Sequence, residues 1–540
     1  MGNPRTALRT TTTGALLTAL VASAVLATGP SGAVAAETPA AAPASGAAAG
    51  RSSGGGIRFV DIPGDGGVVL KGNVVTPTDA VPGHRYPVLV LPASWATSQL
   101  QYLIQARKFA DSGYVVVSYT TRGFLGSGGE IEVAGPPDIA DASRVIDWAL
   151  AHTPADPAAV GMAGMSYGAG ITLLAAAQDK RVRTVVALSG WGDLEQSIYG
   201  GRTQHLQAGA LLGGAGYLAG RPSAEFQQVL RGFMSSDLSG EEAMRAWAAR
   251  RSPANQLDRL NANGPAVMLA GAWGDTLFPP NQYAAFYEKL AGPKRLELRP
   301  GDHVTPELAG LLGVPNDTWN SAHRWLDHYL KGVDNGVDRE RPVQLSSRSG
   351  GGYETYPDWK SVGATERKIA LGARQRILAN VDSGANGGMV ILSNALDQFL
   401  KLPPVVSVPL LPRPFAAVWE SGRYGAIQHV RGTARLHTTV SSTASSGTFM
   451  AYLYDVGPLG LGKLVSTAPY TFHDRTPGRP FGVDLELGST AYDVPAGHRL
   501  TVVVDTVDPL YAEHNPFGAR LTFSSPAADP SYLSVPLREE

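Results

Sequence analysis

Cysteine is absent from the 540 residues of this chain, and net charge is nearly absent as well. Without a thiol there can be no disulfide, no cysteine nucleophile, no thiolate zinc site and no iron–sulfur cluster. The 45 Lys and Arg residues almost cancel the 46 Asp and Glu residues, which leaves a net charge of −1. Such a chain creates no field that concentrates nucleic acid or an anionic membrane. We therefore expect neither as a partner, and any nucleophile must be an oxygen or an amine.

Long apolar runs are also lacking. Residues 15–27 form an uncharged stretch after Arg5 and Arg9, but a bilayer-spanning helix needs about 20 apolar residues. The length suits a signal peptide, and the small residues 33–35 suit its cleavage site. The sequence thus predicts a signal peptide over residues 1–35 and a secreted mature protein without a membrane partner. An uncleaved anchor or a buried helix is the alternative.

The mature chain is expected to begin with a flexible leader over residues 36–56, which are mostly Ala, Pro, Gly and Ser. From 57 to 336, short β-branched runs alternate with helical patterns, and this alternation predicts an α/β domain around a mostly parallel sheet. The expected strands cover residues 68–75, 87–91, 114–119, 159–163, 182–188, 266–270 and 295–298. The expected helices cover residues 100–112, 138–152, 167–178, 280–290 and 319–331.

Residues 191–263 interrupt that alternation, because they carry helix signals and no convincing strand. They are predicted to form an inserted helical cap, which either walls a pocket or is a surface excursion without a role. Within it, Ser239 followed by Glu242 is a capping-box pattern that predicts a helix running to Arg251.

A second domain is expected over residues 340–540, where the helical period disappears. Short alternating runs such as 434–440, 448–454 and 500–504 are separated by Gly, Pro and Asp. Many short strands joined by turns predict an all-β domain, either a jelly roll or another β-sandwich.

A nucleophile elbow is the first candidate for chemistry. Residues 164–168 read Gly-Met-Ser-Tyr-Gly, but a chain with 64 glycines meets the Gly-x-Ser-x-Gly pattern easily by chance. The setting is more informative, because an expected strand ends at the motif and an expected helix begins at Tyr167. The two glycines permit a tight turn that presents the hydroxyl of Ser166 above the sheet. Ser166 is predicted to be the nucleophile, with an ordinary turn serine as the alternative.

A serine nucleophile needs a base and an acid that orients the base. Of the eleven histidines, only His303 falls in a loop after a late strand. Asp275 follows the preceding strand and completes the order Ser, Asp, His that α/β-hydrolases use. Asp193 and Asp302 are the alternative acids, although neighbouring residues on an extended loop point apart, which places Asp302 badly for the ring of His303.

Two N–H donors must face the oxyanion of the tetrahedral intermediate. The elbow geometry makes the backbone N–H of Tyr167 one of them. The second is expected in the turn of residues 93–95, as a backbone N–H or as the indole N–H of Trp95. A purely apolar wall is the alternative role for Trp95.

These residues resemble the CocE/NonD serine hydrolases, typified by cocaine esterase and Xaa-Pro dipeptidyl-peptidase. The likeness covers nearly the whole mature chain and rests on Thr121-Arg122-Gly123, Gly126-Ser127-Gly128, residues 161–168, Trp325 to Gly332, Ala451 to Val456 and Val494 to His498. It implies an α/β-hydrolase fold with a C-terminal jelly roll and assigns the triad to Ser166, Asp275 and His303.

Two departures from the family accompany the resemblance. Trp95 stands where cocaine esterase has its oxyanion tyrosine. Thr120 replaces the aspartate that commonly precedes the Arg-Gly pair, which implies a lost local hydrogen bond with catalysis intact.

The predicted reaction is two-step acyl transfer without a metal or cofactor; the sequence has no His-Glu-x-x-His run and no dinucleotide-binding fingerprint. The expected substrate is a small ester or peptide. A dipeptidyl-peptidase must pair the free ammonium of its substrate with a buried carboxylate. The cap offers Asp193, Glu195, Glu225, Glu241 and Glu242, most of which are more simply solvated, and Glu195 is the first to test. Trp191, Tyr199 and Trp273 are predicted to form an aromatic acyl pocket, or else to belong to the core.

The resulting hypothesis is a secreted serine hydrolase of ester or amide bonds, most similar to an Xaa-Pro dipeptidyl-peptidase. A carboxylesterase or acylase of the cocaine esterase type is the alternative within this class. A secreted, non-catalytic binding protein on a hydrolase scaffold is the alternative from another class.

Overall fold

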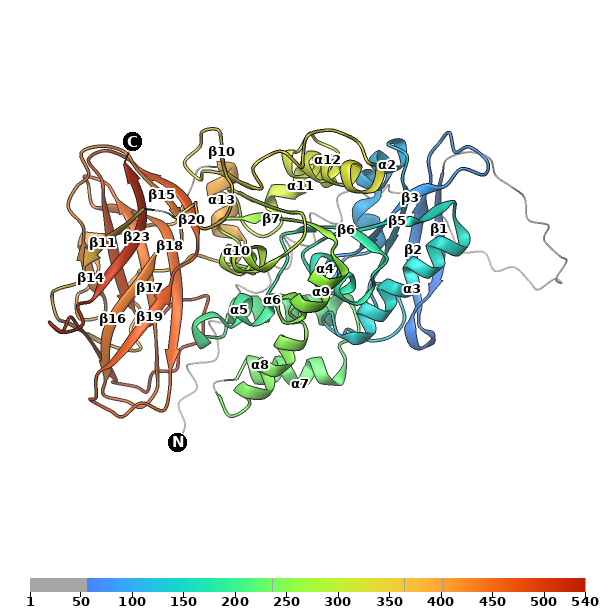
Figure 1. Ribbon diagram of the computed structural model, residues 1–540. Helices are drawn as coiled ribbons and strands as arrows, with labels where there is room; N and C mark the ends of the chain where they lie inside the picture. The colour runs from blue at the N-terminus through green and yellow to red at the C-terminus, as the bar shows by residue number, and fades with distance from the viewer. Residues whose placement is uncertain (1–55, 236, 364, 401–402, 540) are drawn as a thin grey trace, which may run out of the picture. The chain divides into compact units, whose positions relative to one another are not determined.

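A computed structural model describes residues 56–235, 237–363, 365–400 and 403–539 (Figure 1). The expected signal peptide and all but the last residue of the expected leader lie outside these ranges. All the residues in these ranges belong to one compact unit. No helix in the described part of the chain is long and apolar enough to cross a membrane.

A ten-stranded sheet forms the first domain, in the order β1-β2-β4-β3-β5-β6-β7-β8-β9-β10. Its strands are β1 (Ile57–Pro63), β2 (Val69–Val75), β3 (Tyr86–Pro92), β4 (Val115–Tyr119), β5 (Ala155–Met165), β6 (Val182–Leu188), β7 (Ala266–Ala272), β8 (Lys294–Arg299), β9 (Val343–Ser346) and β10 (Tyr353–Tyr356). The seven strands from β4 to β9 in this order are parallel, and the strands at both edges are antiparallel. Every residue of β7 is buried, as expected for a parallel strand covered on both faces.

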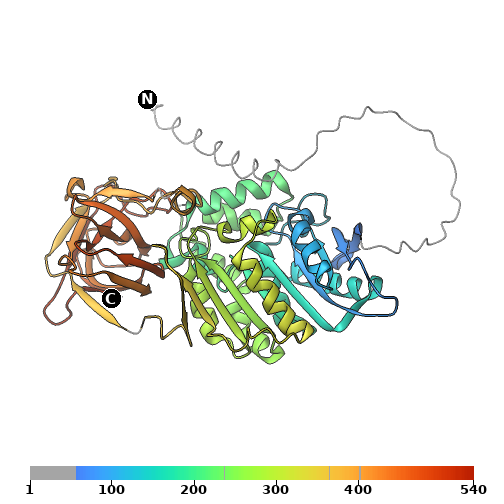
Figure 2. The same cartoon turned by 90° about the horizontal axis from the view of Figure 1, so that it is seen from above.

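Helices cover this sheet (Figure 2). They are α2 (Leu103–Asp111), α3 (Pro136–His152), α4 (Tyr167–Gln178), α10 (Pro280–Lys289), α11 (Thr305–Leu311) and α12 (Asp317–Lys331). Sequence signals explain both ends of α12: the side chain of Asn316 accepts a hydrogen bond from Trp319 N, and Gly332 ends the helix at φ 67°. The sequence predicted these strands and helices within a few residues, except β1, β9, β10 and α11.

The first domain extends further than expected. Strands β9 and β10 pair with each other and continue the ten-stranded sheet beside β8. The boundary to the second domain therefore lies after Tyr356 and not at about residue 340. The two strands are only four residues long, too short for the alternating pattern to assign them to a sheet.

The cap is helical, as expected, and comprises α5 (Leu194–Ile198), α6 (Leu206–Ala219), α7 (Ala224–Phe233), α8 (Glu241–Arg250) and α9 (Leu257–Asn263). The predicted capping box is wrong. Gly240 occupies the N-cap of α8, and the hydroxyl of Ser239 donates a hydrogen bond to Asp237 at 2.9 Å. An acidic neighbour two residues away competes with the helix for the serine side chain.

The cap is fastened at both of its ends. Near its start, Gln207 Nε2 donates to Pro509 O at 3.0 Å, and the hydroxyls of Thr203 and Thr471 lie 2.8 Å apart. Near its end, Arg251 Nε donates to Glu132 O at 3.2 Å. The first pair of contacts joins the cap to the second domain, and the last joins it to the first.

The second domain consists of two antiparallel sheets that enclose one apolar core, as the sequence predicted. Leu436 and Val535 from one sheet and Phe449 and Val502 from the other meet in that core. Its elements are β11 (Glu366–Ala370), β12 (Gln375–Leu378), α13 (Leu392–Leu400), β13 (Val405–Ser407), β14 (Ala417–Glu420), β15 (Gln428–Gly432), β16 (Arg435–Ser442), β17 (Gly447–Val456), β18 (Leu461–Phe472), β19 (Phe481–Glu486), β20 (Thr490–Val494), β21 (Arg499–Asp505), β22 (Arg520–Ser524) and β23 (Tyr532–Glu539).

Candidate active site

Ser166 lies on a strained turn between β5 and α4. Its φ of 53° and ψ of −117° lie outside the regions that residues other than glycine favour. A Cβ at Gly164 would collide with the backbone of Gly168, and a Cβ at Gly168 would collide with Pro92 O. Both glycines of the motif are therefore required by close backbone contacts, as the elbow hypothesis predicts.

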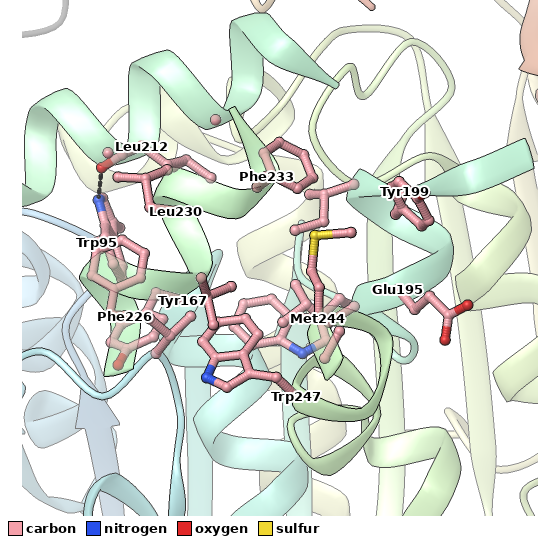
Figure 3. Close-up of a pocket in the computed structure, with 18 of the residues that line it drawn as sticks. Trp95, Tyr167, Glu195, Tyr199, Leu212, Phe226, Leu230, Phe233, Met244 and Trp247 are labelled. Atoms are coloured by element: carbon pink, nitrogen blue, oxygen red, sulfur yellow. Dashed lines mark hydrogen bonds between the residues drawn. The ribbon is translucent and has the colours of Figure 1, made fainter. Parts of the chain in front are cut away.

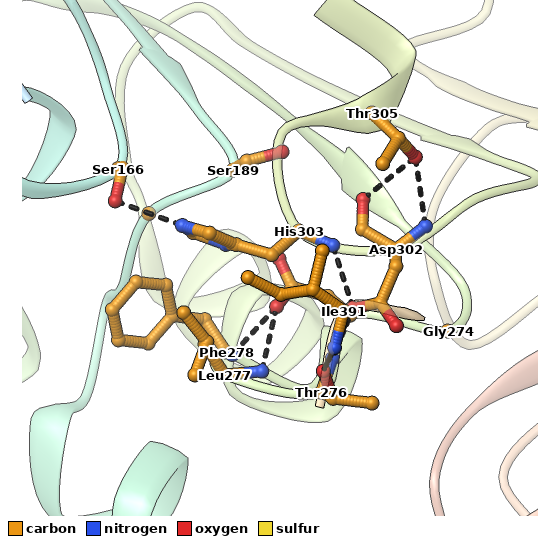
Figure 4. Close-up of polar contacts among 12 residues, drawn as sticks. Ser166, Ser189, Gly274, Thr276, Leu277, Phe278, Asp302, His303, Thr305 and Ile391 are labelled. Atoms are coloured by element: carbon orange, nitrogen blue, oxygen red, sulfur yellow. Dashed lines mark hydrogen bonds and ion pairs between the residues drawn. The ribbon is translucent and has the colours of Figure 1, made fainter. Parts of the chain in front are cut away.

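The structure brings the three predicted side chains together, although they are far apart in the sequence. Ser166 Oγ lies 2.8 Å from His303 Nε2 (Figure 4), and His303 Nδ1 lies 3.0 Å from Asp275 Oδ2. The other oxygen of Asp275 accepts hydrogen bonds from the backbone N–H groups of Leu277 and Phe278. All three side chains are buried, so their mutual interactions are little screened by solvent.

The charge environment favours a protonated imidazole at His303. Burial alone would lower the pKa of this group, but the carboxylates of Asp275, Asp302 and Glu307 outweigh burial and raise it above 6.5. An imidazolium at this position would be stabilised by these three carboxylates.

Asp302 does not orient the imidazole of His303. Its Oδ1 instead accepts hydrogen bonds from the backbone N–H of His303 at 2.7 Å and from the N–H and hydroxyl of Thr276 at 2.8 and 2.9 Å (Figure 4). Burial and the nearby Asp275 raise the pKa of Asp302 to about 6. The remaining alternative, Asp193, caps α5 by accepting from Gln196 N.

Glu307 is a buried acid near the imidazole that the sequence did not reveal. It lies on α11, is fully buried, and accepts hydrogen bonds from the hydroxyl of Ser189 at 3.1 Å to each oxygen. Burial raises its pKa to about 7, although the charge of His303 opposes that shift. Its helix, α11, has only seven residues, which is too short for a clear periodic pattern in the sequence. The one available signal was an acidic residue shortly after His303.

Residues 93–95, which follow β3, offer one free backbone donor for an oxyanion. The indole N–H of Trp95 donates to Leu212 O of α6 at 2.9 Å, so it is already engaged (Figure 3). Ala93 N and Ser94 N donate to Tyr119 O and the side chain of Gln101. Within the described residues, the backbone N–H of Trp95 has no acceptor. The sequence analysis expected the second oxyanion donor to be either a backbone N–H of these residues or the indole N–H of Trp95, and the structure leaves the backbone N–H free.

Thr120 does not lose its local hydrogen bonds, contrary to expectation. Its hydroxyl interacts with both the backbone N–H and the side chain of Gln99. A threonine hydroxyl both donates and accepts, so it can replace a carboxylate at this place.

A largely apolar pocket with a cavity volume of about 90 Å³ adjoins Ser166 beneath the cap. Figure 3 shows the side chains that the cap contributes to its walls. The predicted residues Trp191, Tyr199 and Glu195 line it. Further walls come from three cap helices, with side chains that the sequence analysis did not single out: Leu212 of α6, Phe226, Val229, Leu230 and Phe233 of α7, and Met244 and Trp247 of α8. The sequence signal that could have identified the residues of α7 is their spacing: aromatic and aliphatic side chains three or four residues apart lie on one face of a helix.

Trp273 is not part of this pocket. It is buried, and its indole N–H donates to Ser346 O of β9 at 2.7 Å. Its role is to join the end of β7 to the edge of the sheet, so the prediction of a pocket residue was wrong. The sequence could not reveal this because β9 had not been assigned to the sheet.

The pocket offers no uncompensated carboxylate among the described residues that line it. Glu195 lies 2.6 Å from the guanidinium of Arg245, which lines the same pocket. Two of the other acidic residues considered in the sequence analysis also form ion pairs: Glu225 with Arg251 and Glu241 with Arg202, each at 2.8 Å. None of the acids apart from Glu195 lines the pocket.

Two family models match the chain. The X-Pro dipeptidyl-peptidase (S15 family) model matches residues 65–305, and the X-Pro dipeptidyl-peptidase C-terminal non-catalytic domain model matches residues 427–534. The first range contains the elbow, the acid loop and the histidine loop, and the second lies inside the β-sandwich.

Curated relatives include a "Putative serine esterase" of Mycobacterium bovis, 23% identical over 312 residues, which are 48% of this chain and 47% of the relative. The chain thus spans about half the length of that relative. A "Putative Xaa-Pro dipeptidyl-peptidase" of Streptomyces avermitilis is 23% identical over 482 residues, covering 74% of this chain and 69% of the relative.

Solved structures share the fold over nearly the whole chain. An alpha-amino acid ester hydrolase superposes with a TM-score of 0.65 at 18% identity and covers 92% of this chain and 98% of its own. A CocE/NonD family hydrolase of Staphylococcus aureus gives 0.64 at 13% identity, with 89% and 94% covered. Since the catalytic region and the β-sandwich match the two domain models of the X-Pro dipeptidyl-peptidases, the chain belongs to this S15 family of serine hydrolases.

Proposed function

We propose that this protein is a secreted serine hydrolase that cleaves esters with a bulky, uncharged apolar acyl group. The observation that supports the chemistry is the chain of contacts from Ser166 Oγ through the ring of His303 to Asp275. The apolar pocket with aromatic and aliphatic walls next to Ser166 supports the substrate class.

The reaction follows from the roles of these groups. His303 Nε2 takes the hydroxyl proton as Ser166 Oγ attacks the ester carbonyl, and Asp275 holds the ring with Nε2 free to accept. The backbone N–H groups of Tyr167 and Trp95 receive the developing oxyanion. His303 then gives the proton to the leaving alcohol, and water repeats the sequence on the acyl-enzyme to release the acid.

The pocket argues against a free ammonium on the acyl side. A buried cation needs a carboxylate that no other group neutralises, and Glu195 is paired with Arg245. Large aromatic and aliphatic walls instead favour an uncharged group, since burying apolar surface stabilises a complex by about 25 cal/mol per Å².

An Xaa-Pro dipeptidyl-peptidase activity is the second candidate, and the match of both X-Pro dipeptidyl-peptidase models supports it. It requires that Glu195 exchange Arg245 for the amino terminus of the substrate. The two candidates differ in the substrate that they require, so one set of assays separates them.

The test has two stages. A fluorophosphonate probe should label the wild-type protein and not Ser166→Ala; an unlabelled wild type would indicate a binding protein on a hydrolase scaffold. Labelled protein is then assayed with p-nitrophenyl acetate and octanoate, with Gly-Pro p-nitroanilide and with the N-acetylated anilide. We expect octanoate to be the best substrate. Cleavage of the free-amine anilide alone would contradict the esterase proposal and establish the peptidase.

Export through a signal peptide is the second part of the proposal. It rests on the apolar stretch of residues 15–27 behind Arg5 and Arg9 and on the small residues 33–35. N-terminal sequencing of protein from the culture medium should begin at residue 36. Full-length protein found only inside cells would contradict export.

A further inference from the structure

A segment of the second domain reaches the loops of the candidate triad. Residues 386–398, which we call the strap, run into α13 and contact both the acid loop and the histidine loop. Asn394 Nδ2 donates to Gly274 O at 2.8 Å and to Asp302 Oδ2 at 3.1 Å. Gly274 directly precedes Asp275, and Asp302 directly precedes His303. One amide group thus joins the residue before the acid to the residue before the base.

Other contacts fix the strap in this place. Ile391 N donates to the hydroxyl of Thr276 at 2.8 Å (Figure 4), and the hydroxyl of Thr305 donates to Gln398 Oε1 at 2.5 Å. Ile391 has a φ of 63°, which is rare for a β-branched residue. Such backbone strain persists where surrounding contacts over-determine it. The strained residue is the one that points its N–H at the acid loop.

The carboxylate of Asp302 depends on these donors. It is fully buried, and it accepts hydrogen bonds from His303, from Thr276 and from Asn394. The first two belong to the catalytic loops themselves. The amide of Asn394 is the donor that comes from the second domain, and a hydrogen bond to a buried charged group is among the stronger ones.

The strap is in turn attached to the β-sandwich, at the face of β17 that lies opposite the core shared by the two sheets. Gly387 N donates to Asp508 Oδ2 at 2.6 Å, and the hydroxyl of Tyr452 donates to the same oxygen at 2.8 Å. Asp508 and Tyr452 are both buried. The position of Asn394 is therefore set by the folded second domain and not by the catalytic domain alone.

We propose that Asn394 is a positioning residue of the second domain. It holds the loops of Asp275 and His303 at the relative positions that the reaction needs. This inference rests on the proposed triad, and it gives the β-sandwich a role in the reaction. Asn394 touches neither substrate nor reacting atoms. Its effect passes through Gly274 and Asp302, so it should change the rate of acylation and leave ground-state binding of the ester nearly unchanged.

The experiment compares Asn394→Ala and Asn394→Asp with the matched variant Asn281→Ala. The side chain of Asn281 also joins the two domains, through Leu487 O at 2.9 Å and Ser489 N at 2.5 Å, but it makes no hydrogen bond to either catalytic loop. The full-length variants are assayed for kcat and KM with p-nitrophenyl octanoate, for the rate of fluorophosphonate labelling, and for melting temperature. Asn394→Asp keeps the size of the side chain and removes the N–H donor, so it serves if the alanine variant fails to fold.

We expect both Asn394 variants to lose about 10- to 100-fold in kcat and in labelling rate, with KM within about twofold of wild type. Asn281→Ala should stay within about twofold of wild type in kcat. An unchanged kcat in the Asn394 variants, or an equal loss in Asn281→Ala, would overturn the positioning role while the wild type remains active. A wild type without labelling or turnover would overturn the proposed function itself.

Discussion

The indole N–H of Trp95 is bound to Leu212 O of the cap at 2.9 Å, while the backbone N–H of the same residue has no acceptor among the described residues. The ring also packs edge-on against Tyr167 and Phe226, with centroids 5.2 and 5.6 Å away. Trp95 therefore connects the turn after β3 to the cap through its side chain and leaves its main chain available to an oxyanion.

Trp95→Phe tests this division of roles. It removes the indole donor and keeps an aromatic ring, so we expect a loss of about 1 kcal/mol in the free energy of unfolding. The kcat for p-nitrophenyl acetate should stay within about threefold of wild type, because the backbone donor remains. Loss of a true oxyanion donor costs about 10²- to 10³-fold in kcat, and a drop of that size would assign the role to the indole. Trp273→Phe, which loses an indole bond to Ser346 away from the pocket, is the control.

The pH dependence of kcat/KM follows from the pKa of His303. Because the base must be neutral to accept the proton of Ser166, activity is lost as pH falls through this pKa, which lies above 6.5. Asp275→Asn removes a neighbouring negative charge, so the acidic limb should move to lower pH while kcat falls by about 10⁴. Asp193→Asn should leave the profile unchanged. An acidic limb below pH 6 in the wild type would contradict the charge environment described for the ring.

Acyl-chain preference depends on the walls contributed by the cap. Phe233→Ala opens space at the α7 side of the pocket, so the ratio of kcat/KM for a bulky aromatic acyl ester to that for acetate should rise severalfold. Glu195→Gln should leave both esters within about twofold of wild type, because its charge is compensated by Arg245. Steady-state kinetics with a series of p-nitrophenyl esters measures both. An unchanged ratio in Phe233→Ala would place the acyl group outside this pocket.

Glu307→Gln should make the protein more stable at alkaline pH. The carboxyl of Glu307 keeps its proton in the folded state up to a pKa of about 7, whereas an ordinary Glu ionises near 4.5. Ionisation therefore favours the unfolded state increasingly as pH rises between these values, by about 3 kcal/mol at the upper end. Urea unfolding of the variant and the wild type at pH 5 and pH 8 measures this difference. The exposed control Glu242→Gln should show no such pH dependence, and a constant difference for Glu307→Gln would refute the assignment.

Reasoning from strand ends was enough to predict Ser166, Asp275 and His303. Parallel strands end at the same edge of the sheet, so polar residues directly after β5, β7 and β8 converge there. The same reasoning could not reach Asn394, because it comes from the second domain, and its role depends on how that domain folds back. It also failed for Trp273, since the type of a residue does not tell whether its ring faces a pocket or the neighbouring strand.

The α/β fold and the β-sandwich were predictable because hydrophobic periodicity changes at their junction. The position of the junction was not, because β9 and β10 have only four residues each. Ser239 shows a similar limit. Its sequence position fits a capping box, but its hydroxyl donates to Asp237 and does not cap α8. Which of two nearby groups a serine side chain binds can be seen only in the three-dimensional structure.

Fastening of the cap at both ends restricts how a substrate can enter. Swinging the whole cap outward as a rigid lid would break the contacts of Gln207 with Pro509 on one side and of Arg251 with Glu132 on the other. Entry by rotation of side chains and small shifts of α7, which carries neither Gln207 nor Arg251, keeps both anchors intact. The width of the opening that these movements create, more than the volume of the pocket, should then limit how branched the alcohol group of an ester can be.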